Sequence, residues 1–412
     1  MAVFISNRKL MLFCVLLAFL VTIILSQLLY MNLFNNVAQI VPEPVIRNKT
    51  VVEGPSREKQ QDQKMTQTVP EPEIRNKAVV GGPSREKQQD EKIVLLFWSR
   101  VWGKPAKREE GVWERGNEPG QCPVACEVTI DHSRINEAKS FIVHGNDLNP
   151  LPPSKHIPWI LYTQENPIHA PVLGNQDLMS QFHILHSYRL DSDFPTPLFS
   201  KPNLDPPLAF NNKTGGIMAA FSNCEPVRTA YLKQLMNYIK VDSYGGCLHN
   251  KEGLTRRYGG DYRLLKQNLA RSYKFLTVFF NEDCDYFVDE QIVHAFNAGS
   301  VPIVMSTDKV YEFLPGNLKD AIVDVRNFKS PKDLADRLTF LMSNEMEYNK
   351  FLEWKVKGLG DISDTVIGKF WDEKFGHWCR ICEAVSQGKW HKEGLKKDDC
   401  KPRDYKDWGI KP

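Results

Sequence analysis

The chain has 412 residues, of which 42% are hydrophobic and 25% are charged, and its formal net charge is +3. This length allows two domains with sizeable cores and some additional segments. A mean hydropathy of −0.39 excludes a polytopic membrane protein. So small a net charge excludes nucleic-acid binding through bulk charge, and we expect no nucleic-acid partner.

Residues 10–30 form an apolar run without a charged residue, long enough to cross a bilayer as one helix. Arg8 and Lys9 precede it, so the positive-inside rule places residues 1–9 in the cytosol and the rest of the chain on the luminal side. A cleavable signal peptide is the alternative. The length of the run and the lack of a small-x-small cleavage site before Asn32 favour a signal anchor. We therefore expect a single-pass type II membrane protein.

Residues 31–92 are expected to form a disordered stem. Within it, residues 41–64 return as residues 69–92 with a period of 28 residues and four differences. In both copies of the repeat Pro, Gly, Gln and charged residues dominate, and aromatic residues are absent, so a packed core is not expected. A ligand-binding repeat is one interpretation, but two copies are fewer than a solenoid needs. A duplicated tether that holds a domain off the membrane is favoured.

The chain has nine cysteines, and only Cys14 lies in the apolar run. The remaining eight form an even set in a translocated domain, which predicts disulfides. The alternative is a zinc site that joins the C-x3-C pair Cys122/Cys126 to the C-x2-C pair Cys379/Cys382.

Two Asn-x-Thr sequons, at Asn48 and Asn212, suit the luminal side of the membrane. An anchor, a stem and a disulfide-bonded luminal domain are together typical of a glycoprotein resident in the Golgi or the ER.

From residue 93, short apolar runs alternate with loops and helical patterns. Strands are expected at residues 93–98, 141–145, 159–163, 182–189, 217–222, 241–246, 274–280, 300–305 and 321–325. Helices are expected at residues 227–239, 288–298 and 331–342. This alternation predicts an α/β fold with two parallel sheets, in residues 93–205 and 206–360, and a connector around residues 194–214. A ligand crevice is expected between the halves, at the carboxyl ends of the strands, and the tail at 361–412 is expected to brace one half against the other.

Two D-x-D patterns, at residues 191–193 and 283–285, resemble sites that hold a metal against a nucleotide diphosphate, but the pattern is frequent by chance. His183 and His186 lie in an apolar run and are expected to pack rather than to bind a metal. A helix that begins near Val288 after an acidic loop offers N–H groups to a diphosphate, and an ordinary strand-to-helix crossover is the alternative.

A series of motifs between residues 93 and 382 carries a more specific signal. In chain order they are residues 122–147 (CPVACEVTIDHSRINEAKSFIVHGND), WILYTQENP, YRLDSD, FSNCEPVR, VDSYGGC, AGSVPIV, LEWKVKG and WCRIC. Their order and spacing resemble the α1,3-fucosyltransferases of glycosyltransferase family 10. VDSYGGC and CRIC are most similar to the plant and invertebrate members that fucosylate the N-glycan core. The resemblance implies a GT-B fold, in which two Rossmann-like domains face a cleft.

The resemblance also implies the reaction, an inverting transfer of L-fucose from GDP-fucose to O3 of a GlcNAc residue without a required metal. Glu165 aligns with the general base, Arg228 with the cation that neutralises the departing GDP, and Glu290 with a glutamate that contacts the sugar. The implied donor-binding positions are Ser222, Asn223, Val241, Asp242, Ser243, Tyr244, Asn281, Phe287 and Gln291. The implied acceptor-side positions are Arg189 and Asp191, which accounts for the first D-x-D without a metal.

The donor motif departs from the family pattern F-E-N-x4-D-Y-x-T-E-K. Phe280 replaces its first glutamate, Phe287 its tyrosine, Asp289 its threonine and Gln291 its lysine. Loss of one preorganised charge at a leaving group costs about 3 kcal/mol, or roughly 10²-fold in rate. Asp289 either repels GDP or recruits a divalent cation (Mn²⁺ or Mg²⁺) in place of the lysine.

Three functions remain open on the sequence. The favoured one is a working Golgi fucosyltransferase that uses GDP-fucose and a GlcNAc-containing glycan and is held to the membrane by one helix. The second is a weak or inactive relative that binds a glycan or another transferase, and the third is a transferase with a different nucleotide sugar.

The resemblance also implies disulfides. It pairs Cys224 with Cys247, and it pairs Cys122 and Cys126 with Cys379 and Cys382 in an order that the sequence does not assign. Cys284 and Cys400 either pair with each other or stay free.

Overall fold

The computed structural model describes residues 92–106, 122–153, 156–254, 262–372, 376–398, 400 and 402–412, which belong to one compact unit. The expected signal anchor at 10–30, the sequon at Asn48 and the stem before Lys92 lie outside the described residues. Within the described ranges, no helix combines the length and the apolar character that a bilayer crossing needs.

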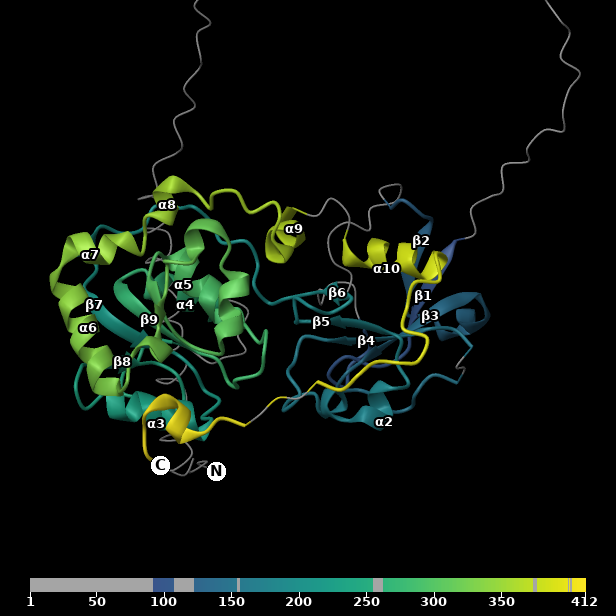
Figure 1. Ribbon diagram of the computed structural model, residues 1–412, viewed down its shortest axis with the longest axis horizontal. Coiled ribbons are helices and arrows are strands. Elements are labelled where there is room, and N and C mark those ends of the chain that lie inside the picture. The colour runs from purple at the N-terminus through teal and green to yellow at the C-terminus, as the bar shows by residue number, and fades with distance from the viewer. Residues whose placement is uncertain are drawn as a thin grey trace, which may run out of the picture. The chain divides into compact units, whose positions relative to one another are not determined.

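The N-terminal half of the described chain contains a six-stranded sheet in which all neighbouring strands are parallel, in the order β2-β1-β3-β4-β5-β6 (Figure 1). Its strands are β1 (Ile93–Phe97), β2 (Cys126–Thr129), β3 (Ala138–His144), β4 (Trp159–Thr163), β5 (Ile184–Ser187) and β6 (Phe194–Pro195). Every residue of β1 and β4 is buried. Such uninterrupted apolar strands are typical of parallel sheets that are covered on both faces.

Short helices accompany this sheet in the described residues. They are the 3₁₀ helices His132–Glu137 and Pro171–Gly174 and the α-helices α2 (Gln176–Met179) and α10 (His377–Ser386). Although α10 comes from the far end of the chain, it packs on β1, β2 and β6. Trp378, Ile381 and Cys382 of α10 join the same buried cluster as Ile93 and Leu95 of β1.

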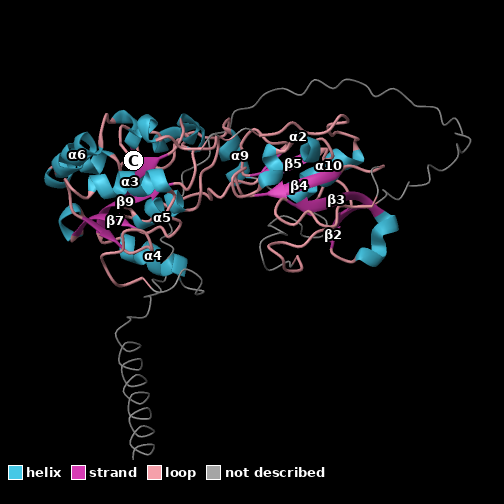
Figure 2. Ribbon diagram, turned by 90° about the horizontal axis from the view of Figure 1, so that it is seen from below, coloured by secondary structure: helices cyan, strands magenta, loops and turns pink. Residues whose placement is uncertain are grey.

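The following half contains a second parallel sheet, in the order β11-β10-β9-β7-β8. Its strands are β7 (Gly215–Ala219), β8 (Val241–Ser243), β9 (Tyr273–Phe279), β10 (Val301–Met305) and β11 (Val323–Asp324). The helices around it are α3 (Pro226–Leu235), α4 (Tyr262–Ala270), α5 (Gln291–Ala298), α6 (Pro331–Ser343) and α7 (Glu345–Lys350) (Figures 1 and 2). The remaining described helices are α8 (Trp354–Lys357), α9 (Val366–Asp372) and the 3₁₀ segments Phe210–Asn212, Asp308–Phe313, Gly316–Leu318, Val325–Asn327 and Tyr405–Trp408.

Local sequence signals explain where several of these helices begin and end. The Ser330 side chain accepts a hydrogen bond from the Asp333 N–H group, and Pro331 occupies the first turn of α6, as expected at a helix N-terminus. Helix α5 ends at Gly299, whose φ of 66° is the left-handed conformation that glycine adopts without steric cost.

The α/β class with two parallel sheets is confirmed, and β4 has the predicted bounds. The edge strand β2 is absent from the predicted set because its four residues are only half-buried and carry no apolar run. Helix α5 begins at Gln291 rather than near Val288, because the Asp289 carboxylate accepts the Gln291 backbone N–H group at 2.9 Å and turns the chain there.

All eight described cysteines form disulfides. The pairs are Cys122–Cys379, Cys126–Cys382, Cys224–Cys247 and Cys284–Cys400. The zinc alternative for the first four cysteines is therefore wrong, since their sulfurs are bonded to each other. The structure also assigns the order of the first two bridges and pairs the last two cysteines.

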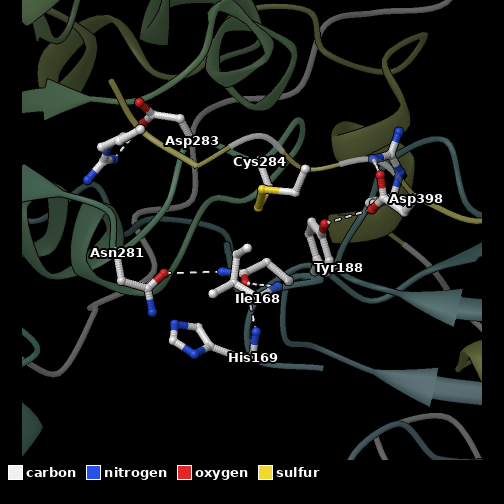
Figure 3. Close-up of a disulfide and its surroundings, with 11 residues drawn as sticks. Ile168, His169, Tyr188, Asn281, Asp283, Cys284 and Asp398 are labelled. Carbon is white, nitrogen blue, oxygen red and sulfur yellow. Dashed lines mark hydrogen bonds and ion pairs between the residues drawn. A yellow bond between two sulfur atoms is a disulfide. The ribbon is translucent and has the colours of Figure 1, made fainter. Parts of the chain in front are cut away.

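The chain after Gly360 contacts both halves, which is the bracing role expected of it. On the first half, the Leu395 N–H group donates to the Phe182 carbonyl at 3.0 Å. Figure 3 shows the Cys284–Cys400 disulfide beside the Tyr188–Asp398 hydrogen bond of 3.1 Å. Farther along, the tail residues Trp408 and Ile410 are buried in the core of the second half.

Candidate active site

A cavity of about 470 Å³ lies where strands of both sheets end. The last residue of β3 and residues that follow β4, β7 and β9 reach it, as expected for the carboxyl ends of parallel strands. The lining residues are Val101, Trp102, His144, Tyr162, Gln164, Glu165, Leu198, Ala220, Phe221, Ser222, Asn223, Arg228, Tyr262, Arg263, Lys266, Asn281, Phe287, Asp289, Glu290, Gln291 and His294.

Glu165 enters the cavity from the first half, two residues after β4 ends. Its backbone N–H group donates to the Thr163 hydroxyl at 3.1 Å, which fixes the turn that follows the strand. The next residue, Asn166, is buried and donates through Nδ2 to Asn281 Oδ1 of the second half at 3.2 Å (Figure 3). Glu165 is therefore held beside a direct polar contact between the two halves.

Arg228 enters the cavity from the first turns of α3 and is only 2% exposed. Its guanidinium donates to the carbonyls of Phe279, at 2.6 Å, and Asn223, and it lies 4.6 Å from the Phe221 ring centroid. Burial, helped by the nearby Arg403, lowers the pKa of Arg228 to about 10. Arg228 therefore stays a cation at neutral pH, held in a rigid backbone cradle.

The segment from Asp289 to Gln291 lines the cavity where α5 begins. Gln291 Nε2 donates to Asp289 Oδ2 at 2.9 Å, and Gln291 Oε1 accepts a hydrogen bond from Lys266 Nζ of α4 at 3.2 Å. Burial, and secondarily the neighbouring Glu290, raise the pKa of Asp289. The residue in the place of the family lysine is thus a bridge between a carboxylate and another lysine.

Of the expected site residues, the cavity gathers Glu165, Arg228 and Glu290, although they lie 63 and 62 residues apart in the chain. Five expected donor-side residues also line it, namely Ser222, Asn223, Asn281, Phe287 and Gln291.

The expected donor positions in β8, and Tyr244 directly after it, do not line this cavity. The Asp242 carboxylate accepts a hydrogen bond from the Tyr273 hydroxyl at 2.7 Å, and Ser243 donates to the Cys247 carbonyl at 2.8 Å. The Tyr244 hydroxyl lies 2.8 Å from that of Tyr273, and Val241 packs in the core. Their polar groups are therefore satisfied inside the second half.

Arg189 and Asp191 also lie outside the cavity lining. The Arg189 guanidinium pairs with Asp191 at 2.8 Å and with Asp398 of the tail at 2.8 Å, so in this structure it helps to hold the tail. Asn212, the described sequon, is exposed at the end of a short 3₁₀ helix.

The structure adds residues that sequence reasoning did not single out. Trp102, His144 and Tyr162 form an aromatic wall on the first half, with the Trp102 and His144 rings 5.3 Å apart and those of His144 and Tyr162 5.8 Å apart. His144 and Tyr162 each lie at or next to the end of a predicted strand. That position could have marked them as residues near the expected crevice. Lys266 and His294 lie on helices, where no motif marked them.

The described residues contain no group of three or more His, Cys, Asp or Glu side chains arranged to hold a metal ion. Asp289, the suggested cation ligand, instead accepts hydrogen bonds from Gln291. A divalent cation here stays a hypothesis for experiment.

The arrangement combines one carboxylate on the first half with buried cations on the second, across a cavity large enough for a small ligand. A carboxylate at a cavity wall can accept a proton from a hydroxyl, and fixed cations can neutralise an anionic leaving group. The geometry is therefore suited to moving a group from an anionic carrier to a hydroxyl.

Comparison with known proteins agrees with this chemistry. Residues 89–199 match a family model described as "Fucosyltransferase, N-terminal", and residues 210–397 match "Glycosyltransferase family 10 (fucosyltransferase) C-term". Curated relatives include "GDP-fucose protein O-fucosyltransferase 3" from Bos taurus, 27% identical over 340 residues, and from Homo sapiens, 27% identical over 334 residues. Each alignment covers 74% of this chain and 63% of the relative, so the chain spans less than two thirds of their length.

Among solved structures, an α1,3-fucosyltransferase with GDP-fucose aligns with a TM-score of 0.48 and 15% identity, over 78% of this chain and 96% of that one. The two family models together span most of the chain, including the residues that line the cavity from both halves. The chain belongs to glycosyltransferase family 10.

Proposed function

We propose that this protein transfers L-fucose from GDP-fucose to an acceptor hydroxyl, with inversion at the anomeric carbon. The observation that carries the proposal is that Glu165, Arg228 and Glu290 meet on one cavity from distant parts of the chain. The family assignment supports the same reaction class.

In this mechanism the acceptor oxygen attacks fucose C1 while Glu165 takes its proton. The C1–oxygen bond to the diphosphate breaks, and the electron pair leaves with GDP, whose charge Arg228 neutralises. Glu290 contacts the sugar. One positioned carboxylate is enough for a single inverting displacement, and no covalent intermediate forms.

For the acceptor, we propose O3 of a GlcNAc residue in an N-glycan or a related glycan. The motifs shared with the α1,3-fucosyltransferases support this choice, and the aromatic wall formed by Trp102, His144 and Tyr162 is suited to packing against a sugar ring. A second candidate acceptor is a hydroxyl group of a protein. It is favoured by the names of the curated relatives, which are protein O-fucosyltransferases.

The test is to incubate the purified full chain with GDP-fucose and either N-glycans or folded secretory-protein domains, with Mn²⁺ or with EDTA. Fucosylated glycan supports the first acceptor, and fucose on serine or threonine supports the second. No product on either class despite GDP binding would overturn the proposal in favour of an inactive relative. Product only from another nucleotide sugar would show a different donor, and full activity in EDTA would remove the metal hypothesis.

We further propose that the protein is a single-pass type II Golgi membrane protein with a luminal catalytic domain. The apolar run at residues 10–30 supports the anchor, and the four disulfides suit an oxidising compartment. Asn212, which is exposed, should carry an N-glycan. A mobility shift with peptide N-glycosidase F that decreases in Asn212→Gln tests the luminal orientation, and the absence of any shift would contradict it.

A further inference from the structure

Helix α4 buries a lysine and exposes leucines. Lys266 is 4% exposed, whereas Leu264 and Leu265 are 58% and 42% exposed. Hydrophobic burial alone favours the opposite rotation of the helix. A buried ammonium is retained in a protein where polar or anionic groups meet it. On this face of α4, Lys266 lines the cavity and α4 packs against α5.

The Lys266 ammonium is held by an amide of fixed orientation. Gln291 Oε1 accepts its hydrogen bond at 3.2 Å. The other end of that amide, Nε2, donates to Asp289 Oδ2 at 2.9 Å, and Asp289 Oδ1 accepts the Gln291 backbone N–H group at 2.9 Å. Since a carboxylate only accepts, Asp289 turns the amide oxygen toward the lysine.

The charge of Lys266 changes the pKa of two other polar residues that line the cavity on the second half. It lowers the pKa of Asp289, against the larger effect of burial, and together with burial it lowers the pKa of His294. Both residues line the cavity. Lys266 therefore contributes positive potential to the side of the cavity where Asp289 and Glu290 contribute negative charge.

Two buried cations from different helices thus line one cavity, Arg228 from α3 and Lys266 from α4. Two separate cations match two linked phosphoryl groups, because each can donate charge-assisted hydrogen bonds to a different one. We propose that Lys266 and Arg228 together bind the diphosphate of the nucleotide-sugar donor, and that Gln291 is a positioning residue for Lys266.

This inference rests on the proposed function and deepens it. The cation that the family carries at position 291 is supplied in this chain from α4, and Gln291 holds that cation in place. When the bond from C1 to the diphosphate oxygen breaks, the electron pair stays on that oxygen, and Lys266 and Arg228 share its charge. With Gln291 at this position, the lysine that binds the diphosphate comes from α4, and donor binding is kept.

The test measures binding of GDP and of guanosine to the purified full chain by calorimetry. Lys266→Met should weaken GDP binding by about 10- to 100-fold and leave guanosine binding unchanged, because guanosine has no phosphate. Adding Gln291→Lys to Lys266→Met should restore part of the lost GDP affinity. Unchanged GDP affinity in Lys266→Met, or an equal loss for guanosine, would overturn the proposal.

A matched control is Lys213→Met. Lys213 is as buried as Lys266, at 3% exposure, but it donates to the Arg271 carbonyl at 3.0 Å and does not line the cavity. Its GDP affinity should stay unchanged. If Lys266→Met does not fold, Gln291→Leu carries the test, since it removes the acceptor of the ammonium and should weaken GDP binding several-fold with guanosine unaffected.

The outcomes separate this inference from the proposed function. If the unmodified chain binds GDP and transfers fucose, and Lys266→Met binds GDP with the same affinity, only the inference fails. If it binds UDP and not GDP, in a manner that depends on Lys266, the donor assignment fails and the diphosphate site stands. If it binds neither nucleotide, both fail.

Discussion

Arg403 Nη1 lies 3.1 Å from Glu225 Oε2, so a residue nine positions before the C-terminal Pro412 pairs with the residue that caps α3. Glu225 also accepts the backbone N–H group of Arg228 at 2.8 Å. A second oxygen, Asp283 Oδ1, lies 2.6 Å from Arg403 Nη2, and the arginine side chain is fully buried. The C-terminal tail therefore supports the wall of the cavity through a buried ion pair.

We expect Arg403→Met to lower the free energy of unfolding by about 3–5 kcal/mol, because it leaves two partly buried carboxylates without their cationic partner. GDP affinity should fall as well, since Glu225 holds the first turn of the helix that carries Arg228. Chemical denaturation and calorimetry measure the two effects. Lys406→Met, an exposed change in the same tail, is the control. A loss below about 1 kcal/mol would contradict the role of the pair.

Removing all residues after Gly360 should unfold the protein. The deletion removes α10, the partners of three disulfides and the buried residues Trp408 and Ile410. Circular dichroism and gel filtration of the secreted protein provide the measurement. The double variant Cys284→Ser/Cys400→Ser removes one bridge alone and should cost about 2–4 kcal/mol while the chain still folds. A soluble, active protein ending at Gly360 would refute the bracing role.

Glu165→Gln should reduce kcat for fucosyl transfer by roughly 10²- to 10⁴-fold, since an amide cannot accept the proton of the attacking hydroxyl. GDP affinity should not change, because the residue enters the cavity from the first half and the cations lie on the second. Initial rates and calorimetry with the same preparation separate the two. Glu393→Gln, at an exposed position in the tail, should behave like the unmodified chain. Retained activity in Glu165→Gln would assign the base elsewhere.

Stability should fall as the pH drops from about 6.5 to 4, in part through His186. Burial lowers the pKa of His186 to about 4, and its ring packs on those of His377 and Trp378 at 4.4 and 5.0 Å. The pKa of His377 is lowered by burial as well, with Arg380 also nearby. Below pH 6.5 the unfolded chain binds protons that the folded chain excludes. His186 alone then accounts for a loss of about 3 kcal/mol at pH 4.

Urea unfolding at pH 7, 6 and 5 measures this dependence. His186→Phe keeps an aromatic ring in the core and should flatten the pH dependence, although it loses the 2.7 Å contact with the Phe194 carbonyl and is less stable at pH 7. The exposed His156→Phe should leave the profile unchanged. Identical slopes in all three proteins would show that other groups titrate with unfolding.

Most of the fold was predictable because its strands are short, apolar and buried on both sides. Trp159–Thr163 carries that signal in five consecutive residues, and Glu165 lies two residues after its end. Glu165, Arg228 and Glu290 were identified through the resemblance to glycosyltransferase family 10, and each lies near a strand end or a helix start. The edge strand Cys126–Thr129 was not, because half-buried residues carry no such pattern.

The length of the chain left room for two cores, and the alternation of strand and helix patterns determined that both sheets are parallel. Only the tertiary structure decided that Cys122 pairs with Cys379 and Cys126 with Cys382, because sequence spacing does not report the register of α10 on β2. It also decided the rotation of α4, which sequence hydrophobicity would reverse. Lys266 faces inward because Gln291, 25 residues later, meets its ammonium there. A contact between residues of two different helices cannot be read from the hydrophobic pattern of either helix alone.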